Sequence, residues 1–181
     1  MILLFLGLAL WTAAHFYKRA LPAQRAALGE KGKGFVALAI GLSILLMIFG
    51  YRMWDGTFFW GRTSALTGIN NLLMVAALYF VSPGPSKGAI FYKMRHPMLT
   101  GFSLWALAHL LVNGDTPSLV LFGGLLVWAL AEMVVINRAE PSWTPPQKGS
   151  IAKDAMFLVI SLVLLAVIGL VHSWLGYNPF G

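Results

Sequence analysis

Long apolar runs, separated by short polar segments, follow one another along the chain. We distinguish six of them, at about residues 2–17, 34–52, 65–82, 97–113, 117–137 and 154–175. Each is close to the ~20 residues that an α-helix needs to cross ~30 Å of hydrocarbon. The pattern therefore predicts an all-α integral membrane protein with six transmembrane helices, forming one membrane domain over residues 1–181.

Composition supports the same class. The chain is 59% apolar and only 10% charged, whereas a soluble domain is nearer half apolar and a quarter charged. The net charge of +7 lies in the segments between apolar runs, which favours the lipid bilayer and not nucleic acid as the partner. Without cysteine, the chain has no disulfide, no iron–sulfur cluster, no thiolate ligand and no covalent haem attachment.

The basic residues are divided unevenly between the loops. Loops 18–33, 83–96 and 138–153 together hold eleven of the thirteen Lys and Arg residues, and the second loop has only Arg52 and Arg62. By the positive-inside rule these three loops are cytoplasmic and both termini are outside. No basic segment precedes the first run, so we interpret it as a span and not as a signal peptide.

Two of the runs contain a similar nonapeptide. "GLALWTAAH" (Gly7–His15) and "GFSLWALAH" (Gly101–His109) agree at five of nine positions. Their Gly, Trp and His recur at i, i+4 and i+8, which is one face of a helix. The two runs are expected to cross in opposite directions, so the match suggests a three-plus-three inverted repeat with a site between the halves. Other pairs of runs show no comparable match, and a purely local repeat is the alternative.

Histidine is costly in hydrocarbon, so two histidines at matching positions are candidate ligands; the alternative is that each bonds to a neighbouring helix. Their depths place the imidazoles roughly 10 Å apart along the membrane normal, too far for one bare ion but suited to the two faces of a haem. Zinc would need further ligands. We therefore predict a haem b with His15 and His109 as axial ligands. Beside the ring we expect Trp11 and Trp105 as walls, and Gly7 and Gly101 as the residues that give it room.

A resemblance to a known family adds to this interpretation. It is carried by "AAHFYKRALPAQRAALGE" (Ala13–Glu30), "INNLLMVAALYFVSP" (Ile69–Pro83) and "RHPMLTGFSLWALAHLLVNGD" (Arg95–Asp115). With these stretches the chain resembles the NnrU family of bacterial membrane proteins and, more distantly, the zeta-carotene isomerases of plants and cyanobacteria. The resemblance implies the bacterial inner membrane and, for the NnrU branch, nitrite and nitric oxide metabolism in denitrifying bacteria.

The isomerases are b-haem proteins with one histidine early in the chain and another in an A-H motif after R-H-P. These positions match His15 and His109. Some isomerases have a cysteine three residues before the second histidine as an alternative ligand. This chain has Ala106 there, so only a histidine could serve.

Several functions are open at this stage. The haem could support redox-controlled isomerisation of a lipophilic substrate, electron transfer to a membrane redox partner, or nitric oxide sensing. Because two strong axial ligands fill the coordination sphere, electron transfer or a redox-gated ligand switch is favoured over simple oxygen chemistry. An alternative is an S-adenosylmethionine-dependent membrane methyltransferase of the isoprenylcysteine or phospholipid type, because "RHPMLTG" is similar to the R-H-P-x-Y-x-G pattern of those enzymes. Leu99 replaces the Tyr, and Glu140 replaces a later acidic pair. A non-catalytic membrane assembly factor is the third.

Charged residues near the run ends have candidate roles. Arg95 and His96 precede the fourth run, whose first residue, Pro97, suits the first turn of a helix. They could bind a haem propionate or a substrate anion through charge-assisted hydrogen bonds, or simply anchor the helix end among headgroups. Glu132 lies within the fifth run, where a carboxylate should be paired or protonated. Arg95 and Arg138 are its candidate partners.

Four other polar residues receive no function. Asn70 and Asn71 point to different faces of the third run, so at most one of them lines a site, and hydrogen bonding between helices is expected. His172 lies at the outer end of the sixth run, where a wet histidine needs no function. Glu30 has no mechanism that we can assign.

Overall fold

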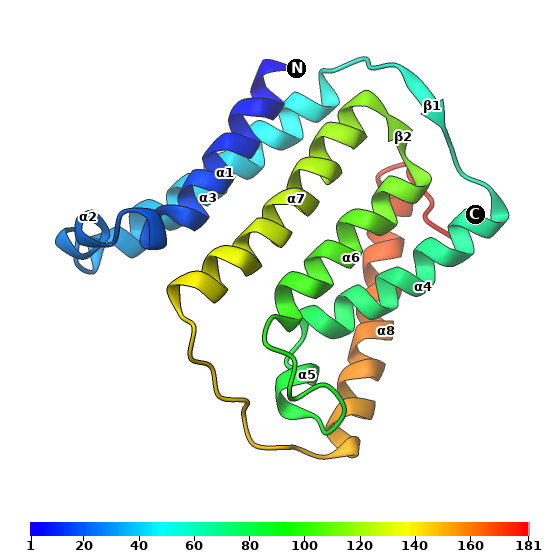
Figure 1. The fold of residues 1–181 in the computed structure, drawn as a ribbon. Helices are drawn as coiled ribbons and strands as arrows, with labels where there is room; N and C mark the ends of the chain where they lie inside the picture. Colours follow the sequence, from blue (N-terminus) through cyan, green and yellow to red (C-terminus); the bar gives the residue numbers. More distant parts are fainter. Residues whose placement is uncertain (181) are drawn as a thin grey trace. The chain divides into compact units, whose positions relative to one another are not determined.

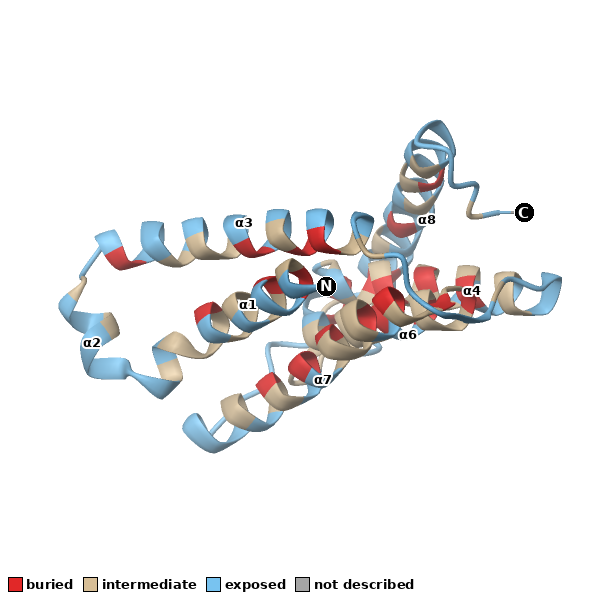
Figure 2. Ribbon diagram, turned by 90° about the horizontal axis from the view of Figure 1, so that it is seen from above, coloured by how far each residue is buried: buried red, intermediate tan, exposed pale blue. Residues whose placement is uncertain are grey.

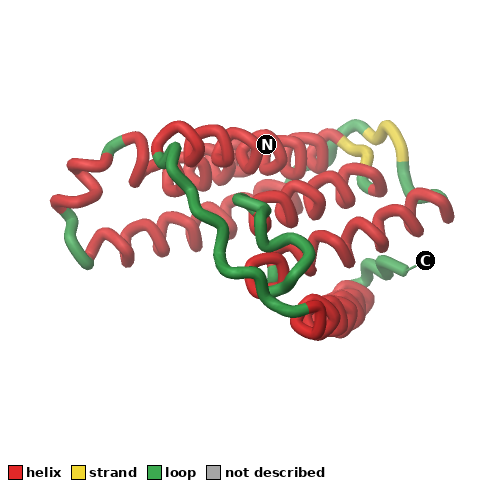
Figure 3. Tube along the Cα trace, turned by 60° about the horizontal axis from the view of Figure 1, so that its bottom comes forward, coloured by secondary structure: helices red, strands yellow, loops and turns green. Residues whose placement is uncertain are grey.

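The computed structural model describes residues 1–180 and is built almost entirely of helices (Figures 1 and 3). The long helices are α1 (Ile2–Ala20), α3 (Lys31–Arg52), α4 (Ser64–Val81), α6 (Pro97–Val112), α7 (Thr116–Ala139) and α8 (Ile151–Trp174). The short elements are α2 (Pro22–Ala27), α5 (Gly84–Lys87), β1 (Phe58–Trp60) and β2 (Gly114–Asp115). The two strands form one small sheet, and an extended loop over residues 140–150 leads from α7 to α8 (Figure 3).

Four of the long helices, α3, α4, α7 and α8, are long and apolar enough to cross a membrane. Helix α6 is apolar but shorter, with 16 residues. Helix α1 has 19 residues and carries Lys18 and Arg19 in its last turn, which lower its hydropathy. The predicted class, an all-helical multi-pass membrane protein, is confirmed, while the number of six crossings stays a prediction.

Side-chain caps and prolines fix where several helices begin. Thr63, Asp115 and Ser150 accept hydrogen bonds from backbone N–H groups in the first turns of α4, α7 and α8, respectively. These N–H groups have no partner within the helix, so a side-chain oxygen at the cap stabilises the start. Pro97 occupies the first turn of α6, where its missing N–H costs nothing.

The chain forms two compact units whose sequences are interleaved. Unit 1 comprises residues 1–59 and 115–141, with helices α1, α2, α3 and α7. Unit 2 comprises residues 60–114 and the chain from residue 142, with α4, α5, α6 and α8. The units therefore do not follow the division into first and last three spans, and a three-plus-three repeat is not shown. One membrane domain over the whole chain stays a prediction.

In unit 1, α1 packs most extensively against α3 and also contacts α7 (Figure 1). Gly7 lies at the α1–α3 contact, where a Cβ would be 2.9 Å from both the Ser43 carbonyl oxygen and the Met47 amide nitrogen. Gly50 of α3 likewise lies against the backbone of Leu4, which is completely buried. Small residues thus let the two backbones approach closely, as is typical of helix pairs in membranes.

In unit 2, α6 packs most extensively against α4, and α8 contacts α4 on another side. Gly101 lies at the α4–α6 contact, where a Cβ would be 2.6 Å from the Ala77 carbonyl oxygen and 2.8 Å from the Val81 amide nitrogen. Asn70 Nδ2 donates a hydrogen bond of 2.7 Å to the Ala108 carbonyl across the same contact. The expectation that one of the paired asparagines bonds helix to helix is confirmed.

In unit 2, a buried carboxylate binds the loop that follows α5 through hydrogen bonds. Asp154, in the first turn of α8, accepts hydrogen bonds from the Tyr79 hydroxyl at 2.5 Å and the Ala89 amide at 2.6 Å. Beside it, the Gly149 amide donates to the Gly88 carbonyl at 2.9 Å. The ends of α4, α5 and α8 are therefore joined through one side chain.

Most of the surface of α3 and α8 is exposed and apolar (Figure 2). On α8 the exposed residues include Leu162, Val163 and Leu170, and on α3 they include Leu38 and Leu42. Patches of this size are unusual on a soluble monomer. They are compatible with contact with the lipid bilayer, which the composition predicts.

The glycine at the α4–α6 contact gives a stability prediction. Gly101→Ala should lower the free energy of unfolding by about 1–3 kcal/mol, because the added methyl group meets backbone atoms that cannot easily move. Thermal unfolding of detergent-solubilised protein, followed by tryptophan fluorescence, measures the change. Gly41→Ala in α3 is the matched control, since nothing lies within 4 Å of its added Cβ. Equal melting temperatures for the two variants would contradict this account of the contact.

Candidate functional site

His15 is held in one orientation by its own helix. Its Nδ1–H donates a hydrogen bond of 2.8 Å to the Trp11 carbonyl oxygen one turn earlier in α1. Because a carbonyl oxygen only accepts, the proton is on Nδ1 and the lone pair of the neutral ring is on Nε2. A histidine ligand commonly has its second ring nitrogen bonded to a carbonyl in this way.

The imidazole of His15 lies in an aromatic cluster of unit 1. Its centroid is 4.2 Å from the Trp11 ring and 4.7 Å from the Trp128 ring of α7, and the two indoles are 5.1 Å apart. Trp128 is buried. The contact with Trp11 follows from the i, i+4 spacing that the sequence shows. Trp128 was missed, because only the packing of α7 on α1 brings it to the histidine.

An ion pair lies one turn further along the same two helices. Arg19 Nη1 is 3.0 Å from Glu132 Oε1, and Arg19 Nη2 is 3.2 Å from Glu140 Oε1. The prediction that Glu132 pairs with Arg95 or Arg138 is therefore wrong. Arg138 is six residues from Glu132 and projects from a different side of α7.

Because Glu132 is buried, its negative charge must be compensated by Arg19. The Glu132 side chain is 6% exposed and Arg19 is 19% exposed, whereas Glu140 is 54% exposed. Within residues 1–180, the second carboxylate oxygen of Glu132 is buried without a hydrogen-bond partner. Arg19 thus provides the charge compensation of a carboxylate that has little access to water.

The sequence predicts which of these residues share a helix face, but it does not predict that the face of α1 packs against the face of α7. Trp128 and Glu132 are spaced i, i+4 on the fifth run, as are Trp11, His15 and Arg19 on the first. Each set lies on one helix face. Nothing in the spacing alone says that the two faces meet.

His109 has the same local geometry in unit 2. Its Nδ1–H donates a hydrogen bond of 2.9 Å to the Trp105 carbonyl, and the two ring centroids are 4.9 Å apart. The His109 carbonyl accepts hydrogen bonds from both the backbone and the side-chain nitrogen of Asn113, which ends α6. Nε2 is again the ring nitrogen that carries the lone pair.

Two residues of unit 2 that carry or can carry a positive charge interact electrostatically with His109. Arg62 and His172 lie close enough to interact with it electrostatically. His172 of α8 donates from Nδ1 to the Ile168 carbonyl at 2.8 Å, so it also presents Nε2. Sequence reasoning gave these two residues no role at His109, because the spacing along the chain does not bring them to α6.

Arg95 and His96 lie at the other end of α6 from His109. His96 caps the helix, its carbonyl accepting from the amide and hydroxyl of Thr100. His109 is twelve positions after Pro97 in this helix, roughly 18 Å along the axis. Arg62, in contrast, is near enough to His109 to interact with it electrostatically. That Arg95 and His96 hold a cofactor or substrate anion stays a prediction.

The glycines of the repeat lie at close contacts between helices. Gly7 and Gly101 each lie where a second helix of the same unit approaches the histidine-bearing helix. In unit 1 that second helix follows in the sequence, and in unit 2 it precedes. The repeat is thus matched in packing around α1 and α6, although the order of the two helices is reversed. Room for a haem at these glycines stays a prediction.

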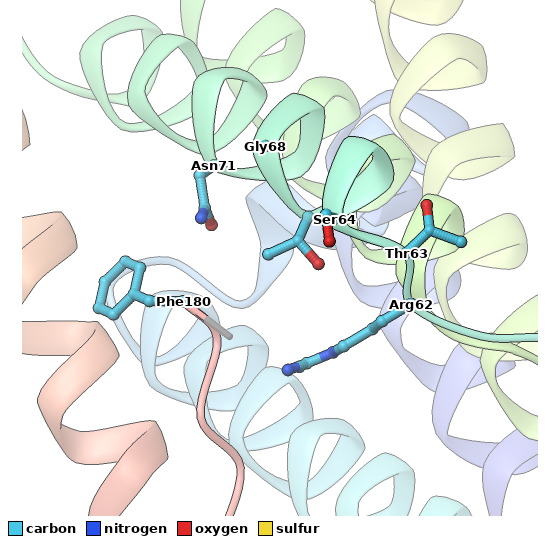
Figure 4. Close-up of a pocket in the computed structure, with 7 residues that line it drawn as sticks. Arg62, Thr63, Ser64, Gly68, Asn71 and Phe180 are labelled. Carbon is cyan, nitrogen blue, oxygen red and sulfur yellow. The ribbon is translucent and has the colours of Figure 1, made fainter.

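Unit 2 also contains a cavity of about 500 Å³ at the start of α4 (Figure 4). It is lined by Arg62, Thr63, Ser64, Thr67, Gly68, Asn71 and Phe180. Asn71, whose role the sequence left open, is therefore a cavity residue, in contrast to Asn70. Glu30 pairs with Lys33 at 2.9 Å on the surface.

Among residues 1–180, no three His, Asp or Glu side chains come together as ligands of one metal ion. The donors that the structure offers are single imidazoles with an oriented Nε2.

Comparison with known proteins gives one match. The sequence model of the NnrU protein family matches residues 3–179, nearly the whole chain. No curated protein and no solved structure matches it. The resemblance inferred from the three sequence stretches is confirmed at the level of the family.

The buried ion pair gives a second stability prediction. Arg19→Gln should lower the free energy of unfolding by roughly 3 kcal/mol or more, because it leaves the Glu132 carboxylate buried without a cation. Lys33→Gln, which breaks the exposed pair with Glu30, should change it by less than about 1 kcal/mol. Melting temperatures in detergent measure both.

A double variant tests the cause. Arg19→Gln with Glu132→Gln removes both charges and should recover much of the lost stability. If the double variant is no more stable than Arg19→Gln alone, the uncompensated carboxylate is not the reason for the loss.

Proposed function

The chain belongs to the NnrU family, and we propose that it is an integral membrane protein that binds haem b, with His15 and His109 as the axial ligands. One observation carries this proposal. Both histidines donate Nδ1–H to the carbonyl of a tryptophan one turn earlier, and both imidazoles contact that tryptophan's indole. The same presentation of Nε2 at two matching nonapeptides is what a bis-histidine haem requires.

The donor set supports haem over other metal groups. The chain has no cysteine, and its described residues form no cluster of three protein ligands. Two imidazoles are sufficient for haem because the porphyrin supplies the other four nitrogens. When bound, haem b supplies one-electron redox chemistry at its iron.

The chain's own residues set the conditions at the ligands. The Trp11 and Trp105 carbonyls fix the tautomers of the imidazoles through the Nδ1–H bond. The indoles exclude water from one side of each ring. In unit 1, the Trp128 ring also contacts the His15 imidazole and limits its access to water.

We place this haem in redox or nitrogen-oxide metabolism at the bacterial inner membrane, with both termini outside. The basic residues at the ends of α1 and α7 and before α6 support this orientation. Electron transfer to a membrane partner and redox-dependent isomerisation of a lipophilic substrate are both within this proposal. A b-haem without an open coordination position favours the first.

The absorption spectrum tests the proposal directly. Protein purified in detergent from haem-replete cells should show a Soret band and a low-spin, six-coordinate spectrum. His15→Ala and His109→Ala should each lose haem or change its spin state, since each removes one axial nitrogen. His172→Ala is the matched control, because it removes a histidine of similar geometry that is not proposed as a ligand.

Other outcomes would identify the competing functions. A colourless preparation would exclude the haem proposal, as would an unchanged low-spin spectrum in both axial variants. If the colourless protein bound S-adenosylmethionine in calorimetry, the methyltransferase alternative would hold. Its acidic residue, Glu140, is paired with Arg19. Binding of neither ligand, with copurification of a respiratory complex, would indicate an assembly factor.

A further inference from the structure

Five of the seven residues that line the cavity at the start of α4 have polar side chains, although α4 is a candidate membrane-spanning helix. Ser64, Thr67, Gly68 and Asn71 occupy positions i, i+3, i+4 and i+7, so they share one face of α4. The opposite side of this segment includes the exposed apolar residue Ile69. Polar side chains are costly in a transmembrane helix and mark functional positions by default. The hydrogen bond from Asn70 to α6 accounts for a polar side chain at that position. Packing between helices does not account for the polar side chains on the face that lines the cavity.

The charge of the cavity favours an anion. Arg62 is the charged residue among the seven described lining residues, and none of the seven is acidic. Hydroxyls and one amide supply further hydrogen-bond donors around it. Figure 4 shows Arg62, Asn71 and Phe180 bounding the space from different sides. A guanidinium with several neutral donors is the usual protein environment of a carboxylate or phosphate.

The C-terminal tail covers this cavity. Arg62 Nη1 donates to the Asn178 carbonyl oxygen, and the Phe180 amide donates to Asn178 Oδ1 at 3.1 Å. The Phe180 ring lies against Gly169 of α8, where a Cβ would meet it. Arg62 is therefore held by a neutral acceptor. An anionic oxygen forms a stronger, charge-assisted bond with a guanidinium and could replace the Asn178 carbonyl.

The size of the cavity indicates more than a bare ion. A volume of about 500 Å³ lies within the ~300–1,000 Å³ range of pockets that hold drug-sized ligands. Phe180 adds an apolar wall beside the polar face. The cavity lies on a helix whose remaining surface suits lipid, so the ligand can arrive from the bilayer.

We propose that this cavity binds the oxyanion head of an amphiphile, a carboxylate or a phosphate on an apolar chain. Arg62 is the charge partner of the head. Ser64, Thr67 and Asn71 supply hydrogen bonds, and the tail around Phe180 covers the bound head. The site lies within unit 2 and does not depend on haem.

Electron paramagnetic resonance tests this proposal. The protein is placed in nanodiscs of zwitterionic phospholipid with nitroxide-labelled stearic acid, and the immobilised fraction of the probe is measured. Wild-type protein should immobilise the acid in preference to its methyl ester, which has the same chain but no charge. Arg62→Gln should weaken binding of the acid by about tenfold or more, because it removes a charge-assisted hydrogen bond.

Three controls make the result specific. Arg52→Gln removes the arginine that ends α3, which does not line the cavity, and should leave binding unchanged. Arg62→Lys keeps the cation and should retain most of the affinity. Asn71→Leu, judged by its melting temperature for folding, should weaken binding of the acid independently of Arg62.

Inorganic phosphate, added as a competitor, separates the amphiphile from a free anion. It should displace little of the bound stearic acid, because it lacks the chain. Efficient displacement by phosphate would overturn the amphiphile part of the proposal. Equal binding of acid and ester, or unchanged binding in Arg62→Gln, would overturn the oxyanion site itself. Because Arg62 also interacts electrostatically with His109, the absorption spectrum of each variant is recorded beside the binding measurement, which separates failure of this site from failure of the ligands proposed for iron.

Discussion

The hydrogen bond from a side chain to the backbone carbonyl one turn earlier recurs throughout this protein. In hydrocarbon no water satisfies a polar side chain, so its hydrogen-bond partner must come from the protein, either from a neighbouring helix or from its own helix. The side chains that bond to their own helix with a spacing of four residues include Thr12, His15, Ser103, His109, Ser161, His172 and Ser173. For the serines and Thr12 this bond satisfies the hydroxyl. For a histidine it satisfies one nitrogen and leaves the other oriented, which makes an intramembrane imidazole a usable ligand.

Positions of the long helices follow closely from the apolar pattern. The fifth run, at about residues 117–137, corresponds to α7 (Thr116–Ala139), and the first run is extended to Ala20 because Lys18 and Arg19 continue the helix beyond hydrocarbon. The short helices α2 and α5 were not predicted, since six and four residues of loop carry no periodic signal. The interleaving of the two units was not predicted either, because hydropathy gives spans but not their neighbours.

In the candidate site, contacts within one helix could also be predicted from the sequence, and contacts between helices could not. The pairing of each histidine with its tryptophan could be predicted, because residues four apart on one helix must be neighbours. Trp128, the Arg19–Glu132 pair and the approach of Arg62 to His109 could not, because each joins segments that are far apart in the sequence. A single sequence shows which residues share a face of each helix, but not which other helix packs against that face.

The interleaved order of the units has a consequence for biogenesis. Unit 1 lacks α7 until residues 116–139 have been synthesised, and by then α4 and α6 of unit 2 have already been made. Arg19 and Glu132 are 113 residues apart in the chain, so their ion pair requires that α7 has been synthesised. The three-helix packing of unit 1 is therefore completed only after most of α4 and α6 has left the ribosome.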